Sequence, residues 1–433
     1  MRVIDEDRFG RSAWWRHDRF GMFIHWGAYA VPARGEWVRS AERMSVEDYQ
    51  YAIDAFRPEP DFDAWAEVAA SAGMRYAILT AKHHDGYALF DSALSDYTTA
   101  KVLGRDFVAE FLAAFRKRGI KVGLYFSLID WSRPDFPHHA DLHHPMRGAV
   151  PDHVPDLDSY RQFLHGQVRE LCSGYGPLDI LWFDFSYEGM GPQQWGADEI
   201  VRIVRELQPD AIMDNRMEGD GANPGSILTA TPSPWAGDFA SPEQIIPTQG
   251  VIGYDGSPVP WESCMTLNNH WGYCASDTVW KPASMVVHKL VECVAKGGNL
   301  LTNVGPDARG RIPTGSAKVL DQVGTWMDDN CESIRGCGPA GLPKPDWGWW
   351  TAGHGKLYAH VFEAPVGPLP LIGLRPDQVK LVRRLADGSE VPMAQCWTVS
   401  DRNDLAFLSM GPQPEFSYPL PDEIDTVFEI TLA

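Results

Sequence analysis

A run of apolar residues that ends on a carboxylate stands near the middle of the chain, at residues 178–186 with the sequence LDILWFDFS. Its length and its Leu, Ile, Trp and Phe content predict a β-strand buried on both faces. Asp184 stands at the carboxyl end of this run. Because stripping water from a carboxylate is unfavourable, a buried one has a partner or a function. Asp184 is therefore a candidate site residue, with a turn cap or an ion pair to an Arg as the structural alternative.

Short apolar runs alternate with helical patterns from residue 20 to about residue 310. The runs predict strands at residues 21–27, 75–86, 121–127, 178–186, 211–216 and 299–306, and the helical patterns predict helices at 62–72, 107–118, 157–172, 198–207, 285–295 and 317–330. This alternation, without a GxGxxG or Walker motif, predicts a (β/α)8 barrel. A doubly wound open sheet is the alternative.

Polar or aromatic side chains stand at the carboxyl ends of at least five of these strands. They are His25, His83, His84, Tyr125, Asp184 and Arg216. In an open sheet a site gathers at one switch point, whereas in a barrel every strand end faces the same pocket. The pattern therefore favours the barrel.

Beyond Gly338 the pattern changes to short alternating runs such as LYAHVF and VFEITLA, separated by Pro, Gly and Asp. This pattern is typical of a small antiparallel β-sandwich. We therefore expect two domains: a catalytic (β/α)8-like barrel at residues 1–338 and a C-terminal β-sandwich at 339–433.

The composition excludes some partners. The chain has 433 residues and a formal net charge of −20, which argues against nucleic acid or an anionic membrane as a partner. The start of the sequence has no apolar run of signal-peptide length, so we expect a soluble, cytoplasmic protein. The seven Cys lack metal-type spacing and are expected to be reduced thiols. The oligomeric state is not fixed by the sequence, and a homo-oligomer stays open.

The strand ends combine carboxylates with neutral hydrogen-bonding and aromatic side chains, which is what sugar chemistry needs. Seventeen Trp residues agree with this, because aromatic rings stack on sugar faces. A metal site at His83, His84 and Asp85 is the competing chemistry. Neighbouring residues of a strand point to opposite faces, so only one His of the pair faces a shared ion. We expect neither a metal nor another cofactor.

Several long motifs identify the chain with a known family. FGMFIHWGAYAVP with EW at 36–37, YAILTAKHHDGYALFDS, GLYFSLIDW, LWFDF, WESCMTLNNHWGY and GGNLLTNVGP, in this order, resemble the family 29 glycoside hydrolases, the α-L-fucosidases. The resemblance runs from about residue 14 to 335.

The resemblance implies an exo-acting, retaining α-L-fucosidase on an irregular (β/α)8 barrel followed by a β-sandwich, with a fucosylated glycan or glycoside as substrate. Asp184 matches the nucleophile that carries the covalent fucosyl-enzyme intermediate. Other matching positions contact the sugar in the family: His25, Glu36, Trp37, His83, His84, Tyr125, Trp182, Arg216 and Trp271.

The acid/base residue is harder to assign, because its position differs between subgroups of the family. Glu243, in GDFASPEQ, matches the subgroup pattern with a Ser two residues before the catalytic Glu. Glu262, Glu218 and Glu188 are rivals, and Glu262 in WESC is the strongest of them. The chain departs from the family at Phe185, where Gly is common, and at Thr302, where an apolar residue is usual.

Two other functions stay open at this point. One is a sugar-binding barrel that has lost catalysis, and the other is a glycosidase for a related sugar such as an α-L-galactoside. The His-rich loop at residues 130–155 is expected to be a solvated surface loop. The alternative is that it shapes the site where an aglycone or a second sugar lies.

Overall fold

The computed structural model describes residues 8–187, 189–394, 404–413 and 416–433. Its central element is a seven-stranded parallel sheet in the order β5-β4-β3-β2-β1-β7-β6. The strands are β1 Phe20–Ile24, β2 Tyr76–Lys82, β3 Lys121–Ser127, β4 Ile180–Asp184, β5 Ile212–Met213, β6 Glu262–Thr266 and β7 Asn299–Val304. Nearly every residue of these strands is buried, as expected of a parallel sheet covered on both faces.

An irregular segment at residues 239–243 lies between β5 and β6 and fills the eighth position. Isolated parallel bridges pair Asp214 with Phe239, Ala240 with Trp261, and Glu243 with Cys264. The sheet thus continues round from β5 to β6, and the predicted barrel class is confirmed. This segment was not predicted as a strand, because it contains Pro and Ser and has no apolar period.

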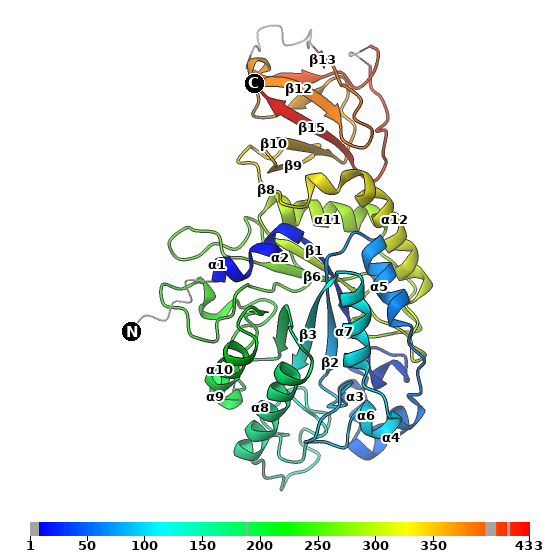
Figure 1. Cartoon of the computed structure of the whole chain (residues 1–433), viewed down its shortest axis with the longest axis vertical. Helices are drawn as coiled ribbons and strands as arrows, with labels where there is room; N and C mark the ends of the chain where they lie inside the picture. The colour runs from blue at the N-terminus through cyan, green and yellow to red at the C-terminus, as the bar shows by residue number, and fades with distance from the viewer. Residues whose placement is uncertain (1–7, 188, 395–403, 414–415) are drawn as a thin grey trace.

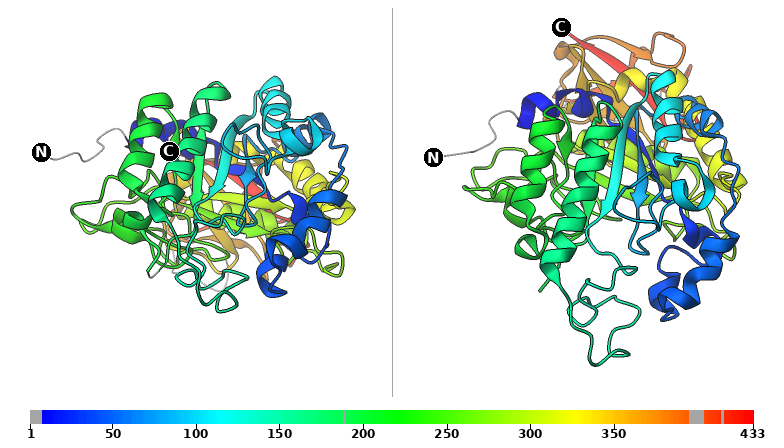
Figure 2. Two further views of the ribbon diagram at one scale, coloured as in Figure 1. Left: turned by 90° about the horizontal axis from the view of Figure 1, so that it is seen from below. Right: turned by 60° about the horizontal axis from the view of Figure 1, so that its bottom comes forward.

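Helices surround the parallel strands (Figure 2). The main ones are α5 Phe62–Ser71, α7 Phe107–Lys117, α8 Leu157–Gly174, α10 Ala197–Leu207, α11 Ala283–Ala295 and α12 Thr314–Asn330, and the shorter ones are α1 Arg8–Arg11, α2 Ala13–Asp18, α3 Val38–Ala41, α4 Val46–Ala55, α6 Thr99–Leu103 and α9 Pro192–Trp195. Asp61, Asp106 and Asp156 cap α5, α7 and α8 by accepting hydrogen bonds from first-turn backbone N–H groups. All six predicted helices are present, and their ends differ from the predicted ones by at most three residues.

Five of the six predicted strands end two to four residues before their predicted ends, and one further strand was not predicted. The strand predicted at 211–216 is only Ile212–Met213, because the side chain of Asp214 accepts the N–H of Phe183 at 2.9 Å in place of a backbone carbonyl. Strand β6 was missed, because ESCMT mixes polar and apolar residues without a clear period.

The C-terminal strands form antiparallel sheets, as predicted. Their orders are β12-β15-β10-β9-β8 and β11-β14-β13. The strands are β8 Gly338–Pro339, β9 Gly348–Gly353, β10 Lys356–Val361, β11 Leu369–Leu371, β12 Val379–Arg384, β13 Met393–Ala394, β14 Ala406–Leu408 and β15 Thr426–Leu432. They enclose a separate apolar core and stand at one end of the molecule, beyond α11 and α12 (Figure 1). The domain division at residue 338 stays a prediction.

Within the described ranges, no helix is both long and apolar enough to cross a membrane.

Candidate active site

One pocket, with an empty volume of about 390 Å³, brings together all eleven residues that the sequence nominated. They are His25, Glu36, Trp37, His83, His84, Tyr125, Trp182, Asp184, Arg216, Glu243 and Trp271. Phe23, Phe185 and Cys264 also line it. The side chains come from the carboxyl ends of the barrel strands and the loops that follow them, which is where barrel enzymes carry their sites.

Asp184 is the last residue of β4 and lies beside Ser127 of β3 in the strand register. The hydroxyl of Tyr125 donates to its Oδ2 at 2.8 Å, and Arg216 Nη1 donates to its Oδ1 at 3.2 Å. Burial raises the pKa of Asp184, while the Arg216 guanidinium and the Tyr125 hydroxyl oppose this rise. The side chain is 14% exposed, so one edge of the carboxylate faces the pocket.

Glu243 lines the same pocket and shares a hydrogen-bond partner with Asp184. Arg216 Nη1 donates to Glu243 Oε2 at 2.8 Å, and Trp271 Nε1 donates to Glu243 Oε1 at 3.2 Å. The same Arg216 nitrogen is 3.2 Å from Asp184 Oδ1, so the two carboxylate oxygens are at most the sum of these distances, 6.0 Å, apart. Although burial opposes its charge, the two carboxylates together raise the pKa of Arg216.

The position of Arg216 is fixed from three sides. Its Nε and Nη2 donate to the hydroxyl and carbonyl oxygens of Ser241 at 3.0 and 2.9 Å. Its guanidinium carbon lies 4.7 Å from the centre of the Trp182 ring, in cation–π contact. The guanidinium is therefore pre-organised between the carboxylates.

His25 and His84 present lone pairs to the pocket, as their hydrogen-bond networks imply. His25 Nδ1 lies 2.7 Å from Asn303 Oδ1, and Asn303 Nδ2 donates to the carbonyl of Trp271, so Nδ1 carries the proton. His84 Nδ1 lies 2.7 Å from the Ser127 hydroxyl, which itself donates to the Ile129 carbonyl. Each Nε2 is therefore an acceptor. Burial lowers the pKa of His25 to about 3 and that of His84 well below its usual value, so both rings are neutral.

Glu36 and His83 complete the floor of the pocket, each 4% exposed. Glu36 Oε2 accepts the N–H of Gly272 at 2.7 Å, and burial raises the pKa of Glu36. A Cβ on Gly272 would lie 2.9 Å from the Glu36 nitrogen, so only Gly allows the two loops to approach. Among the described residues, none forms a hydrogen bond with His83 Nδ1.

Comparisons with known proteins agree with this geometry. The family model for α-L-fucosidases matches residues 5–332. The chain belongs to the α-L-fucosidase family. The resemblance found in the motifs is confirmed, and so is the predicted enzyme class at the level of the family.

Three relatives illustrate the extent of the similarity. Plasma α-L-fucosidase of Rattus norvegicus is 31% identical over 355 residues, which cover 76% of this chain and 71% of that protein. The structure of α-L-fucosidase isoenzyme 1 from Paenibacillus thiaminolyticus is 50% identical, with a TM-score of 0.94 over 98% of this chain and 99% of that one. A family 29 fucosidase of Bacteroides thetaiotaomicron, trapped as a covalent intermediate with 2-fluoro-fucosyl fluoride, is 25% identical, with a TM-score of 0.82 over 98% and 96% of the two chains.

The rival carboxylates of this fucosidase lie elsewhere. Glu262 opens β6 at the amino-terminal end of the barrel strands, where Tyr76 and Trp15 donate to its Oε2. Burial raises the pKa of Glu262 to about 8. Glu218 is held within its own loop, where Ser226, Ser233 and Trp235 donate to its two oxygens. Glu188 lies outside the described residues.

Asp85, the third member of the alternative metal site, points away from the fucosidase pocket. It accepts hydrogen bonds from the Tyr49 hydroxyl at 2.9 Å and from the Tyr87 N–H at 3.3 Å. In the described ranges, no group of three or more His, Cys, Asp or Glu residues has a geometry that could hold a metal ion.

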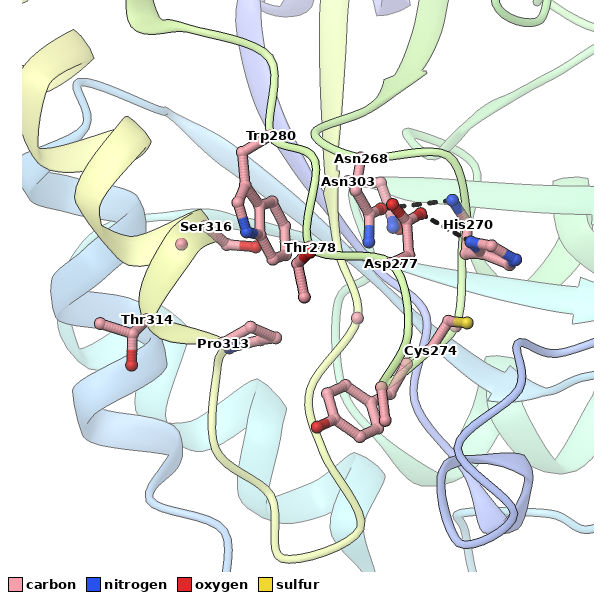
Figure 3. A pocket seen from close by; sticks show the side chains of 15 residues that line it. Asn268, His270, Cys274, Asp277, Thr278, Trp280, Asn303, Pro313, Thr314 and Ser316 are labelled. Carbon is pink, nitrogen blue, oxygen red and sulfur yellow. Dashed lines mark hydrogen bonds and ion pairs between the residues drawn. The ribbon is translucent and has the colours of Figure 1, made fainter.

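A second pocket, with an empty volume of about 580 Å³, adjoins the loop that carries Trp271 (Figure 3). The loop folds back on itself through the hydrogen bond between His270 Nδ1 and Asp277 Oδ2 at 2.7 Å. Asn303 lines this second pocket and also bonds to His25 and to the Trp271 carbonyl. Asn303 therefore couples the loop to the floor of the active site, a role that the motif NLLTN did not reveal.

Proposed function

We propose that this chain hydrolyses terminal α-L-fucosyl residues with retention of configuration, using Asp184 as nucleophile and Glu243 as acid/base. The observation that carries the proposal is the shared nitrogen of Arg216, which limits the separation of the two carboxylate oxygens to 6.0 Å. Retaining glycosidases hold their carboxyl groups about 5–5.5 Å apart, and inverting ones about 6.5–9.5 Å. The geometry favours retention.

In the first step Asp184 attacks the anomeric carbon while protonated Glu243 gives its proton to the glycosidic oxygen. The bond from carbon to the leaving oxygen breaks, and a covalent fucosyl ester forms on Asp184. In the second step ionised Glu243 takes a proton from water, the resulting hydroxide attacks the same carbon, and Asp184 is released as a carboxylate. The negative charge moves from one carboxylate to the other and back, and both positions are in contact with Arg216.

The floor of the pocket supports recognition of a sugar with several hydroxyl groups. The Nε2 lone pairs of His25 and His84 would accept hydrogen bonds from hydroxyls, and Trp182 Nε1, which has no partner among the described residues, would donate one. Because these side chains are buried, the pocket suits one terminal residue, which agrees with an exo-acting enzyme. Trp271 would pack against the apolar edge of the sugar.

The assignment is tested with two variants and two substrates. Asp184→Ala should nearly abolish turnover of every substrate, because no covalent intermediate can form. Glu243→Ala should retain the first step for an aryl fucoside with a good leaving group, and added azide should release a fucosyl azide of retained configuration.

Glu262→Gln is the matched control, because Glu262 is a buried carboxyl group at the other end of the barrel. Azide rescue of Glu262→Ala, with Glu243→Ala near wild-type on an unactivated glycan, would transfer the acid/base role to Glu262. Binding of fucose without release of nitrophenol from the aryl fucoside would favour a non-catalytic sugar-binding barrel. Faster turnover of an aryl α-L-galactoside would instead change the substrate class.

The cellular setting stays a prediction. A role in fucose metabolism would follow from the proposed reaction. Some relatives are named plasma enzymes, so a cytoplasmic location has no support from the comparisons. The expected lack of nucleic-acid and membrane partners, and the oligomeric state, also stay predictions.

A further inference from the structure

The partly exposed side of the catalytic pocket is where a leaving group would extend. Nine of the fourteen lining residues are at most 4% exposed and form its floor and walls. The half-buried lining residues mark the opening, and they are Trp37, Asp184, Phe185, Glu243 and Trp271. A group attached to the anomeric carbon must pass between them.

Four aromatic side chains cluster along one side of this opening: Trp37, His143, Phe185 and Tyr187, here called the aromatic rim. The ring centre of Phe185 lies 5.5 Å from that of Trp37, 5.2 Å from His143 and 5.4 Å from Tyr187. The rings of Trp37 and His143 are 5.2 Å apart. Trp37, Phe185 and Tyr187 are half-buried and His143 is exposed, so the rim offers ring surface to a ligand.

His143 belongs to the His-rich loop 130–155, which extends from the barrel at the bottom of Figure 2 (right). The loop is tied to the rim by Asp141, which is fully buried and accepts hydrogen bonds from Trp131 Nε1 at 2.8 Å and from the Tyr187 hydroxyl at 2.5 Å. The hydroxyl of Ser40 donates to the His143 carbonyl at 2.6 Å. The bonds of Asp141 and His143 therefore hold this part of the loop against the rim, although the side chains of Leu142 and His143 are exposed.

Phe185 is held in an unusual backbone conformation. It follows Asp184 directly and has a φ of 90°, a region that favours Gly. Side chains are retained in such conformations where the surroundings over-determine them, and these places concentrate at functional sites. Here the ring packs against its three rim neighbours and lies 4.7 Å from the ring of His84.

We propose that the aromatic rim binds the leaving group and selects a neutral pyranose. The apolar face of the pyranose would stack on Phe185 and Trp37, and the hydroxyl groups of the pyranose would reach His143. A neutral ligand is favoured over an anionic one, because the carboxylates of Asp184 and Glu243 border the same opening and the chain carries a net charge of −20. This inference rests on the proposed fucosidase activity and adds a preference for sugar leaving groups.

The test measures the effect of each substitution on two substrates, of which only one is large enough to contact the rim. α-L-Fucosyl fluoride has a one-atom leaving group, whereas a fucosyl-galactose disaccharide extends over the rim. His143→Ala should lower kcat/KM for the disaccharide about tenfold and change that for the fluoride less than twofold. Leu142→Ala, an exposed neighbour on the same loop, is the matched control and should change neither. Should His143→Ala fold poorly, His143→Leu removes the hydrogen-bonding ring and keeps an apolar side chain.

A second readout follows binding directly. Enzyme trapped with a 2-fluoro-fucosyl group should be reactivated by added galactose, which accepts the sugar at the same site, and His143→Ala should need a higher galactose concentration. Equal losses on the fluoride and the disaccharide, or no loss on either, would overturn the inference. Faster turnover of a disaccharide with a carboxylate on its second sugar would overturn the preference for a neutral ligand. Absence of fluoride release by the wild-type protein would instead contradict the proposed function itself.

Discussion

Replacing Arg216 by Met should move the acid limb of the pH–rate profile to higher pH. Arg216 Nη1 lies 3.2 Å from Asp184 Oδ1. At that distance and an effective dielectric constant of about 20, opposite charges attract by about 5 kcal/mol, which is nearly four pKa units. Asp184 is partly exposed, and water would replace some of the lost interaction. A carboxylate beside an Arg typically shows a pKa lowered by about 1–3 units, so we expect a rise of about two units.

The sign follows from the chemistry of the first step. Asp184 must be ionised to attack, and the acid limb of kcat/KM reports the pKa of the free enzyme's essential base. Arg216 opposes the effect of burial on the pKa of Asp184. Without it the pKa rises, and activity is lost at a higher pH than in the wild-type protein.

The assay is kcat/KM for an aryl α-L-fucoside from about pH 3 to pH 9, with unfolding midpoints to verify that each variant is folded. Arg216→Lys loses the hydrogen bonds to Ser241 but keeps the positive charge. Because the charge is kept, the acid limb of Arg216→Lys should lie closer to that of the wild type than the acid limb of Arg216→Met does. Arg202→Met, on the exposed face of α10, controls for the substitution itself. The reasoning is refuted if the limb of Arg216→Met does not move, or if the Lys and Met variants shift equally.

Three further predictions concern recognition, stability and metals. His84→Ala should lose about 1–3 kcal/mol of fucose binding in calorimetry at an unchanged unfolding midpoint, and normal binding would remove His84 from the site. Native Glu262 keeps a proton up to about pH 8, whereas the unfolded chain releases it near pH 4.3, so stability should fall between these values. The decline in urea midpoint from pH 5 to pH 8 should be smaller in Glu262→Gln, and an equal decline would contradict this. Prolonged chelation should leave turnover unchanged, and a loss restored by a divalent ion would revive the site at His83, His84 and Asp85.

The sequence predicted most of the pocket because its residues follow strands with a clear pattern. Asp184 ends a run of apolar residues, and Tyr125 lies in a similar run one strand earlier. In a barrel such positions converge whatever the details of the loops. The long motifs identified the family, and the remaining sugar-binding residues were predicted from the positions that match those motifs.

The rest depends on tertiary contacts that no local pattern carries. Segment 239–243 takes the eighth barrel position through bridges to Asp214, Trp261 and Cys264, residues distant in sequence, so Glu243 could be nominated only by its motif. Glu262, in WESC, was the strongest rival for the acid/base role. Long-range contacts distinguish Glu243 from Glu262. Glu243 accepts hydrogen bonds from Arg216 and Trp271 in the pocket. Glu262 accepts them from Tyr76 and Trp15 at the amino-terminal end of the barrel strands.

The electrostatics of the pocket suit a reaction in which one negative charge moves between two carboxylates and the total charge stays constant. On the proposed mechanism one negative charge resides first on Asp184 and then on Glu243, and Arg216 contacts both. Since the guanidinium is fixed by Ser241 and Trp182, it need not move when the charge does, and little reorganisation opposes the step. Burial keeps His25 and His84 neutral, so neither ring competes as a cation for the carboxylates. The pair and its Arg are therefore close to neutral throughout, which suits an uncharged sugar.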